Sequence, residues 1–591
     1  MSLIKISYEK MITFDQLTLA LKRTKTSPSS GLDGETKSNF TEVKLTTLHK
    51  ELKSQKYQPK PVKRINIPKT NEAGTRPLGI ASQRDKIVQA ALLIQLEPIL
   101  EQTFSEYSFS FRTGRNCHDA LHRIKYNWQN TTWLISIDIK KYFDTINHEI
   151  LIKELHNYCD QATVELVIKM LKCGYVNLST NSKVDKLEEG TPQESLISPI
   201  LSNLYLHALD LFVENHLIKA WNYGEERRFV KGYQMRKVIS AKDTILLEEY
   251  PELKEAVSKV KHNRWVLAGQ PARDPDDEKF RRLYYVRYAD DFLIGFCGTK
   301  AEAEGIKEEM ITFLQDELKL VVNLEKSGIA HSSDNSILFL GCYIRYHPNK
   351  IVADVAKSIE DGVTQLKSQA INNATLKAPI DRLLERATKR KYAVKKDNGN
   401  FRATSRRALT GLPEKEIVHR YSSIIRGILQ YYSCVNQRSD LWPVVSLYRK
   451  SCALTLADKL KLRTSAQAFK KFGPVLSIKD ITGKEVTKLY YPESLKTKVD
   501  FKRGQENIDE FSCIYKNEIF GSYRMQTEPV KDKCEMEGCE SSENLELHYL
   551  DPQKNISKKL TAFEKSIIAG QRKTITLCRE HHKNLHDKKL V

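Results

Sequence analysis

The chain has 591 residues, with 95 Lys and Arg against 74 Asp and Glu and a net charge of +21. At about 150 residues per domain this length predicts roughly four structural units, and the positive excess favours a polyanionic partner, because each neutralised phosphate releases condensed counterions. No apolar run approaches the roughly 20 residues of a spanning helix, the start lacks a secretory pattern and the 11 cysteines are sparse, so we expect neither a membrane protein nor a secreted disulfide scaffold.

The first 350 residues are predicted to form two units. Residues 1–60 have the apolar spacing of helices and form an N-terminal extension, whereas residues 61–350 alternate short β-rich runs with helical stretches. A polar, charge-dense segment at about 221–282 interrupts this alternation and is interpreted as an insertion.

Three aspartates stand at the ends of predicted strands. The apolar run at 133–137 ends at Asp138. Two further β-type runs flank Asp290 and Asp291, which predicts a hairpin with adjacent carboxylates at its bend. Such carboxylates repel each other unless a cation lies between them. A turn with two aspartates is common without any function, but all three together supply hard oxygen ligands for two Mg²⁺ ions about 3.5–4 Å apart, which suits in-line phosphoryl transfer.

Beyond Ala378 the chain becomes strongly basic. Residues 382–407 contain ten Lys and Arg against two acids, Glu385 and Asp397. The alternative is a solvated helix face, but such a face alternates its signs, so a phosphate-binding surface is favoured. The candidate RNA contacts are Arg386, Lys389, Arg390 and Lys391. A helical segment follows, and then a basic or polar connector at 479–530, for which DNA binding is a candidate role.

Ligand-type side chains gather in residues 531–591. Four of them have the spacing of a closed tetrahedral Zn²⁺ site: Cys534, Cys539, Cys578 and His581. A second set of candidate metal ligands consists of His548, His582 and His586. The alternative is a set of unrelated surface histidines in a Lys-rich tail. The density of these side chains favours a zinc-binding unit.

The motifs along the chain resemble those of one family. Tyr288-Ala289-Asp290-Asp291 resembles the YADD box of the reverse transcriptases encoded by group II introns, also called intron maturases. Further blocks agree with this family in order: Ile67-Pro68-Lys69 with Arg76-Pro77-Leu78-Gly79-Ile80, Phe109-Ser110-Phe111-Arg112, Gly190-Thr191-Pro192-Gln193, Asn323-Leu324-Glu325-Lys326-Ser327 and Phe339-Leu340-Gly341-Cys342. Residues 379–478 resemble the thumb, or maturase, domain of the family, and residues 531–591 resemble its HNH endonuclease domain.

The resemblance implies a right-hand polymerase of the α+β class. Fingers and palm would occupy residues 61–350, an α-helical thumb residues 379–478, and a small ββα HNH-like zinc domain residues 531–591. The catalytic Mg²⁺ ions would be bound by Asp138, Asp290 and Asp291.

The resemblance also assigns nucleotide contacts. Lys69 and Arg76 would hold the incoming triphosphate, and Phe143 would lie against the sugar. Gln193 would lie near the nucleotide, and Lys326 would donate a proton or contact a phosphate. On the residues alone, Lys69 and Arg76 also fit two surface cations beside a turn, and Phe143 equally fits a core aromatic residue.

Two positions depart from the family pattern. Glu194 stands where the family has Gly, and a carboxylate there would repel template phosphate or crowd the strand. In the HNH-like end, Glu546 and His548 fit the family's pattern, but Tyr549 stands where the general base, a histidine, is expected. A phenol of pKa about 10 is a poor base at neutral pH, so the metal site is expected to be kept and the base lost.

The sequence therefore predicts a multifunctional intron-encoded enzyme. Its activities would be RNA-directed DNA polymerase and maturase, with DNA endonuclease left uncertain. Its partners would be group II intron RNA, target DNA and deoxynucleoside triphosphates. The alternative is a splicing cofactor with degenerate catalytic sites; a telomerase-like or retrovirus-like polymerase is disfavoured. On family grounds a plastid or mitochondrion is favoured over a bacterial cytoplasm. The oligomeric state stays open, with a homodimer as one candidate.

Overall fold

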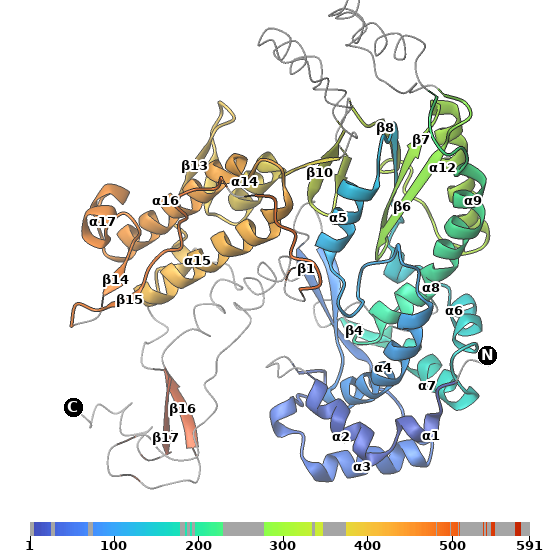
Figure 1. The fold of residues 1–591 in the computed structure, drawn as a ribbon. Coiled ribbons are helices and arrows are strands. Elements are labelled where there is room, and N and C mark those ends of the chain that lie inside the picture. Colours follow the sequence, from blue (N-terminus) through green and yellow to red (C-terminus); the bar gives the residue numbers. More distant parts are fainter. Residues whose placement is uncertain are drawn as a thin grey trace, which may run out of the picture.

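The computed structural model describes residues 5–24, 30–68, 75–177, 184–185, 189–191, 195–228, 277–333, 337–346, 374–479, 482–496, 498–505, 508, 536, 539, 545–549, 574–578 and 580, without the side chains of 66–68, 75–77, 545–549 and 574–577. The fold is mixed α+β, as predicted (Figure 1).

The N-terminal helices lie beside a small sheet. Helices α1 (Tyr8–Met11), α2 (Phe14–Arg23) and α3 (Glu42–Lys53) pack near the long helix α4 (Gln83–Thr103). Ser82 starts α4 as its N-cap, because its Oγ accepts a hydrogen bond from the Asp85 N–H at 3.2 Å. The sheet has the order β2-β1-β4-β5, formed by β2 (Thr75–Ile80), β1 (Val62–Pro68), β4 (Tyr175–Asn177) and β5 (Val184–Asp185).

A second, antiparallel sheet has the order β6-β7-β3-β8. Its strands are β6 (Arg282–Tyr288), β7 (Asp291–Cys297), β3 (Trp133–Ile137) and β8 (Gly328–His331). Because side chains alternate along a strand, its two faces enter different cores. Ile135 and Ile137 join the core that contains helices α8 (Ser198–Phe212) and α12 (Lys300–Asp316). Leu134 joins the core shared with the C-terminal helices.

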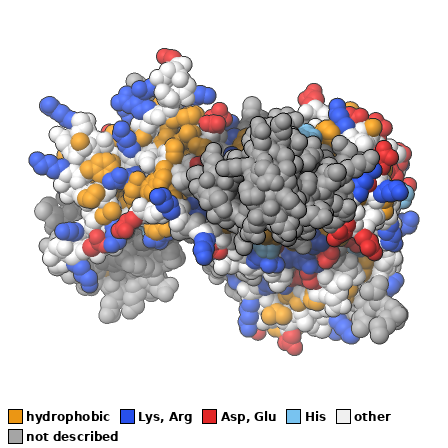
Figure 2. All heavy atoms as spheres, turned by 45° about the horizontal axis from the view of Figure 1, so that its top comes forward, with side chains coloured by type: hydrophobic (Ala, Val, Ile, Leu, Met, Phe, Trp, Pro, Cys, Tyr) orange, Lys and Arg blue, Asp and Glu red, His pale blue; other side chains and the backbone are white. Residues whose placement is uncertain are grey.

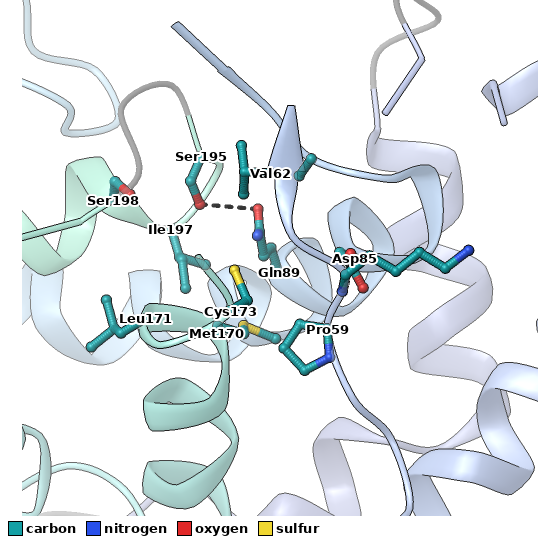
Figure 3. Close-up of a pocket in the computed structure, with 12 residues that line it drawn as sticks. Pro59, Val62, Asp85, Gln89, Met170, Leu171, Cys173, Ser195, Ile197 and Ser198 are labelled. Atoms are coloured by element: carbon teal, nitrogen blue, oxygen red, sulfur yellow. Dashed lines mark hydrogen bonds between the residues drawn. The ribbon is translucent and has the colours of Figure 1, made fainter. Parts of the chain in front are cut away.

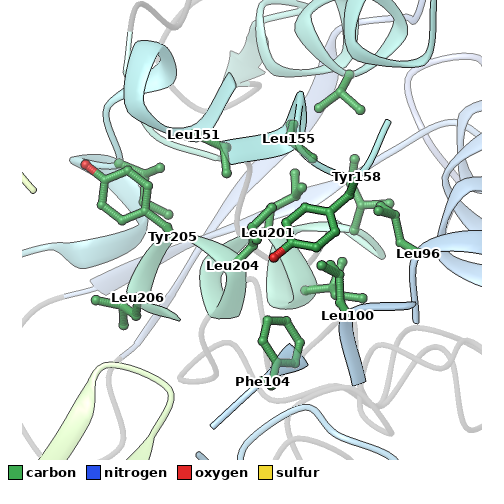
Figure 4. Close-up of a cluster of buried hydrophobic side chains, with 14 of the residues drawn as sticks. Leu96, Leu100, Phe104, Leu151, Leu155, Tyr158, Leu201, Leu204, Tyr205 and Leu206 are labelled. Carbon is green, nitrogen blue, oxygen red and sulfur yellow. The ribbon is translucent and has the colours of Figure 1, made fainter. Parts of the chain in front are cut away.

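In the first core, helices pack closely against one another. Helix α8 places Leu201 and Leu204 toward Leu100 of α4 and Tyr158, which follows α6 (His148–Leu155) (Figure 4). Helix α7 (Gln161–Leu171) and the helical segments η3 (Val213–Leu217) and α9 (Ile218–Trp221) extend this core. Such packing fixes α8 beneath the sheet.

The chain continues into a helical lobe that is joined to the sheet domain, by which we mean the described residues up to 333 with their two four-stranded sheets. A three-stranded sheet of order β11-β10-β9 leads into it: β11 (Thr375–Lys377), β10 (Cys342–Arg345) and β9 (Ile337–Phe339). We call the following part the helical lobe; it comprises α14 (Ile380–Lys389), β12 (Ala393–Lys395), β13 (Phe401–Ala403), α15 (Glu414–Tyr431), α16 (Trp442–Lys459), α17 (Ser465–Phe472), β14 (Ile478–Lys479) and β15 (Glu485–Thr487). Its apolar faces bury Tyr421, Tyr448 and Leu456.

Two further strands are described near the C-terminus. Strands β16 (Leu545–Tyr549) and β17 (Thr574–Cys578) pair in antiparallel register, with His548 opposite Ile575. No helix in the described part of the chain is both long and apolar enough to span a membrane.

Candidate active site

The predicted acidic hairpin is present. In the β6–β7 pair Tyr288 lies opposite Asp291, which leaves Ala289 and Asp290 as the two residues of the turn. Ala289 has φ +57°, in the left-handed region that a tight hairpin turn uses. Because Ile137 of β3 lies opposite Phe292 of β7, the next antiparallel position sets Asp138 opposite Asp291. The register therefore brings all three aspartates to one edge of the sheet.

Asp138 is held by the block that follows α12. The Asp138 N–H donates to Ser327 Oγ at 3.0 Å, and Asn323 Nδ2 donates to Asp138 Oδ2 at 3.1 Å. The Asn323 N–H also donates to the backbone oxygen of Asp138 at 2.8 Å. Lys326 belongs to the same block, and its charge lowers the pKa of Asp291. This places Lys326 beside the carboxylates.

The carboxylates destabilise one another's charge. The Asp291 side chain remains accessible to water, but protein fills most of the volume around it. This desolvation, with the charges of Asp290 and Asp138, raises the pKa of Asp291 to about 7. Desolvation and the charge of Asp138 also raise the pKa of Asp290. Acceptor oxygens that repel one another suit a cation, although among the described residues no three Asp, Glu, Cys or His side chains are arranged so that they could hold a metal ion.

A buried ion pair supports the turn. Arg287 and Asp210 of α8 are both fully buried and make two charge-assisted hydrogen bonds, Nε to Oδ1 at 2.7 Å and Nη2 to Oδ2 at 2.6 Å. Arg287 Nη1 donates to the oxygen of Ala289 and to Asn203 Oδ1, each at 3.1 Å. The guanidinium therefore ties the acidic turn to α8.

Phe143 lies half-buried near a close backbone contact. It belongs to the short helix η2 (Tyr142–Asp144), which starts after Lys141 in the left-handed region at φ +52°. The Thr191 N–H donates to the Phe143 oxygen at 2.7 Å. At Gly190, with φ +82°, an added Cβ would lie 2.7 Å from that same oxygen. The loop that leads to residues 192–194 therefore rests directly on the backbone of Phe143.

A recess lies where the small sheet meets α4 and the start of α8 (Figure 3). Gln89 Oε1 accepts hydrogen bonds from Ser195 Oγ at 3.1 Å and from the Leu196 N–H at 3.2 Å. On the other side of the recess, Asp85 accepts one from the Tyr57 hydroxyl at 2.6 Å, and burial raises the pKa of Asp85. Helix α4 thus anchors the chain just beyond Gly190-Thr191-Pro192-Gln193, which resembles the family's template-side block.

The side chains of three predicted nucleotide contacts, Lys69, Arg76 and Gln193, are not among those described. Arg76 lies in β2 opposite Ile67 of β1, with only its backbone described. Lys69, Gln193 and Glu194 lie outside the described residues.

The predicted RNA contacts lie in the helical lobe, and some of the predicted metal ligands lie in or near the strands β16 and β17. Arg386 and Lys389 lie on α14, and Arg390 and Lys391 follow at its C-terminal end. Of the proposed zinc ligands, Cys578 ends β17 and is buried, and Cys539 is half-buried. His548 and Tyr549 lie in β16 with only their backbone described. Four predicted ligands lie outside the described residues: Cys534, His581, His582 and His586.

Sequence reasoning missed the residues that support the aspartates. Arg287 and Asp210 were not singled out, although a lone Arg within the apolar run before the turn was a signal, since a charge in a buried strand needs a partner. Asn323 and Ser327 were noticed only as part of a family block, and the sequence did not show that both contact Asp138.

An antiparallel sheet with carboxylates at the tip of its hairpin is the arrangement of a template-directed polymerase. A family model described as reverse transcriptase (RNA-dependent DNA polymerase) matches residues 67–228. Two more match further along: type II intron maturase at residues 371–518 and AI2M/AI1M-like, HNH endonuclease at residues 534–582.

The chain belongs to the group II intron-encoded proteins that combine reverse transcriptase, maturase and HNH domains. It is 30% identical to the group II intron-encoded protein LtrA of Lactococcus lactis over 586 residues, which cover 94% of this chain and 91% of LtrA. It is also 30% identical to the putative COX1/OXI3 intron 1 protein of Saccharomyces cerevisiae, over 98% of this chain and 68% of that protein. Maturase K of Palhinhaea cernua is 26% identical over 66% of this chain and 69% of its own length.

We predict that Arg287→Met destabilises the polymerase half by about 3–5 kcal/mol, because Asp210 would stay buried without a countercharge. Urea unfolding measures the change. Lys153→Met, which removes an exposed positive charge from α6, is the control and should cost less than about 1 kcal/mol. Equal losses for the two variants would contradict the role given to the buried pair.

Proposed function

We propose that this reverse transcriptase is catalytically active and uses Asp138, Asp290 and Asp291 to bind two divalent cations, Mg²⁺ by preference. The observation that carries the proposal is that the strand register brings three aspartates to one sheet edge, where burial and the charge of Asp138 raise the pKa of Asp290 and of Asp291. When bound there, Mg²⁺ would neutralise these charges and polarise the primer hydroxyl and the triphosphate.

The other residues of the site act through position and charge. Arg287 fixes the turn that carries Asp290, and Asn323 orients the Asp138 carboxylate. Lys326 lies close enough to Asp291 to lower its pKa, and we propose that it contacts phosphate or donates a proton.

Four more residues complete the proposed nucleotide site. Phe143 rests against the Gly190 loop, and we propose that its ring limits the space for a 2′-hydroxyl. Lys69 and Arg76 would bind the triphosphate, and Gln193 would lie beside the nucleotide.

The helical lobe is proposed to be the thumb and the maturase surface. It follows the sheet domain through β10 and β11, and the face in view in Figure 2 carries more Lys and Arg than Asp and Glu. We propose that the basic residues at and beyond α14 bind structured RNA, which is recognised by its shape and the positions of its phosphates. Group II intron RNA is the proposed partner, and target DNA is proposed to contact the connector and the HNH-like end.

The chain is proposed to have five parts and to act in an organelle. We propose an N-terminal extension to residue 60, fingers and palm at 61–350, the thumb at 379–478, the connector at 479–530 and the HNH-like zinc unit at 531–591. Relatives occur in a yeast, a bacterium and a plant, and we favour a plastid or mitochondrion over a bacterial cytoplasm.

A splicing cofactor without polymerase or nuclease activity is the second candidate. Two residues favour it: Glu194 in the template-side block and Tyr549 in the HNH-like end. The two candidates differ in primer extension, since a cofactor needs only RNA binding.

We expect wild-type protein to extend a DNA primer on an RNA template with Mg²⁺, and Asp290→Ala to lower the rate at least about 100-fold, because a lost metal ligand removes about 3 kcal/mol or more of transition-state stabilisation. Asp397→Ala, which removes an exposed carboxylate from the helical lobe, should leave the rate unchanged. If wild type extends no primer at any Mg²⁺ concentration, the splicing-cofactor function stands. In an active protein, Glu194→Gly should raise the rate if the carboxylate hinders the template.

We predict that changing Arg386, Lys389, Arg390 and Lys391 together to Gln weakens intron RNA binding and flattens its salt dependence. Each lost phosphate contact should lower the slope of log K against log salt by about 0.7–0.9. Filter binding at several salt concentrations measures it. The control removes the same charge from exposed lysines of the sheet domain: Lys10, Lys153, Lys219 and Lys300. An identical slope in wild type and the first variant would show that these residues form a solvated face.

At the C-terminus we expect zinc binding and DNA cleavage to be separable. One Zn²⁺ should be bound by the full chain and lost by truncation at about residue 530, with primer extension retained. Cleavage of target DNA should be slow, since Tyr549 is a poor base, and Tyr549→His should accelerate it. Metal analysis and a nicking assay provide the measurements. Rapid wild-type cleavage that Tyr549→His does not improve would refute this assignment of the missing base.

A further inference from the structure

We propose that residues 500–505 form a strap that fixes the helical lobe against the polymerase sheet domain and so sets how many nucleotides are added per binding event. The inference rests on the proposed function, because it takes the helical lobe as the thumb. The strap follows β15 and crosses from the helical lobe to helix α5 (Cys117–Asn127), which packs against strand β6 of the acidic hairpin.

One face of α5 receives the strap. Asn116, Asp119 and His122 are spaced three residues apart, and His118 and Tyr126 lie on the same side, as i, i+3 and i+4 positions do on a helix. Asn116 and Asp119 already cap α5, since each side chain accepts a hydrogen bond from the other's backbone N–H. These capping side chains also bind the strap, so the contact begins from a rigid surface.

The polar contacts of the strap are specific. Asn116 Nδ2 donates to the oxygens of Lys502 at 2.8 Å and Gln505 at 3.1 Å. Asp119 accepts from Arg503 Nε at 3.1 Å through Oδ1, and from the Gly504 N–H at 3.0 Å through Oδ2. Backbone groups of the strap therefore find their hydrogen-bond partners in the side chains of α5.

His118 joins three parts of the chain. Its Nδ1 accepts a hydrogen bond from the Lys502 N–H at 3.0 Å. Its Nε2 lies 2.6 Å from the oxygen of Tyr431, the last residue of α15 in the helical lobe. Because Nδ1 is an acceptor, Nε2 carries the proton and donates it to Tyr431. The fully buried ring thus links α5, the strap and α15 at once.

Aromatic packing and a lobe contact complete the strap. The ring of Phe501 makes edge contacts with His122 at 5.1 Å and Tyr126 at 5.8 Å between centroids. At the other end, the Asp500 N–H donates to the Ser433 oxygen at 3.0 Å, and Ser433 Oγ donates to the Asp500 oxygen at 2.6 Å. The strap is therefore bound to α5 on one side and to the helical lobe on the other.

The strap affects retention of the template and primer, and the chemical step does not depend on it. A lobe held at a fixed distance from the acidic hairpin keeps a bound duplex in place between additions. If the strap is released, the lobe keeps the core that it shares with the sheet but loses its contacts at α5, so it is held less firmly and the duplex dissociates sooner. A single addition at Asp138, Asp290 and Asp291 needs no such retention.

The test uses the full-length double variant Phe501→Ser/Arg503→Ala, which changes only the strap side of the contact. The matched control is Val486→Ser/Lys496→Ala, two exposed residues of the same connector outside the strap. Hydrogen exchange should show the Lys502 and Gly504 amides losing protection in the strap variant and not in the control. With a heparin trap, the nucleotides added per binding event should fall about fivefold or more, because weakened retention acts through the dissociation rate.

The rate of the first nucleotide addition should change less than about twofold, which separates lost retention from general misfolding. Unchanged amide protection in the strap variant overturns the strap. Lost protection with unchanged product length overturns its role in retention. If wild type extends no primer, the proposed polymerase function fails, and amide exchange alone then decides whether the strap binds α5.

Discussion

The buried ion pair between Arg287 and Asp210 is the contact on which the active-site geometry depends. It packs against a turn whose two residues are each unfavourable by themselves. Ala289 has a left-handed backbone, and burial disfavours the charged form of Asp290. A charged pair in a dry interior is costly unless its geometry is complete. Here four hydrogen bonds complete it, and one of them reaches the turn itself. Helix α8 thereby fixes the position of the sheet edge that carries the three aspartates.

The central sheet also joins the two halves of the protein. One face of β3 and β7 packs on α8 and α12, and the other enters the core of the helical lobe, where Leu134 and Leu293 lie with residues of α15 and α16. Tyr431 donates to the Leu340 oxygen at 2.7 Å, and Tyr432 to the Gly341 oxygen at 3.2 Å. The block Phe339-Leu340-Gly341-Cys342 therefore supports the C-terminal end of α15, and it connects the helical lobe directly to strands β9 and β10.

The sequence predicted what depends on local pattern. The acidic hairpin followed from two β-type runs around Asp290 and Asp291, and the mixed α+β class was implied by the family resemblance. What it could not predict are contacts between distant segments: Asn116 and Lys502 are 386 positions apart, and Arg287 and Asp210 are 77 apart. The Arg within the apolar run signals that a partner is needed, but nothing local identifies Asp210 as that partner, and Asn116 and Lys502 fit an ordinary cap and an ordinary surface charge.

The contact at Gly190 fixes the loop that lies beside Phe143. Where a side chain separates two loops, its size can be adjusted to widen or narrow the space between them. Between Gly190 and Phe143 the spacing is fixed by backbone atoms alone, with no room for even one added carbon. A smaller side chain at 143 would therefore open space beside the contact without letting the neighbouring loop follow. Under the role proposed for Phe143, the side chain alone would then decide how much room the sugar has, while the loop keeps its position.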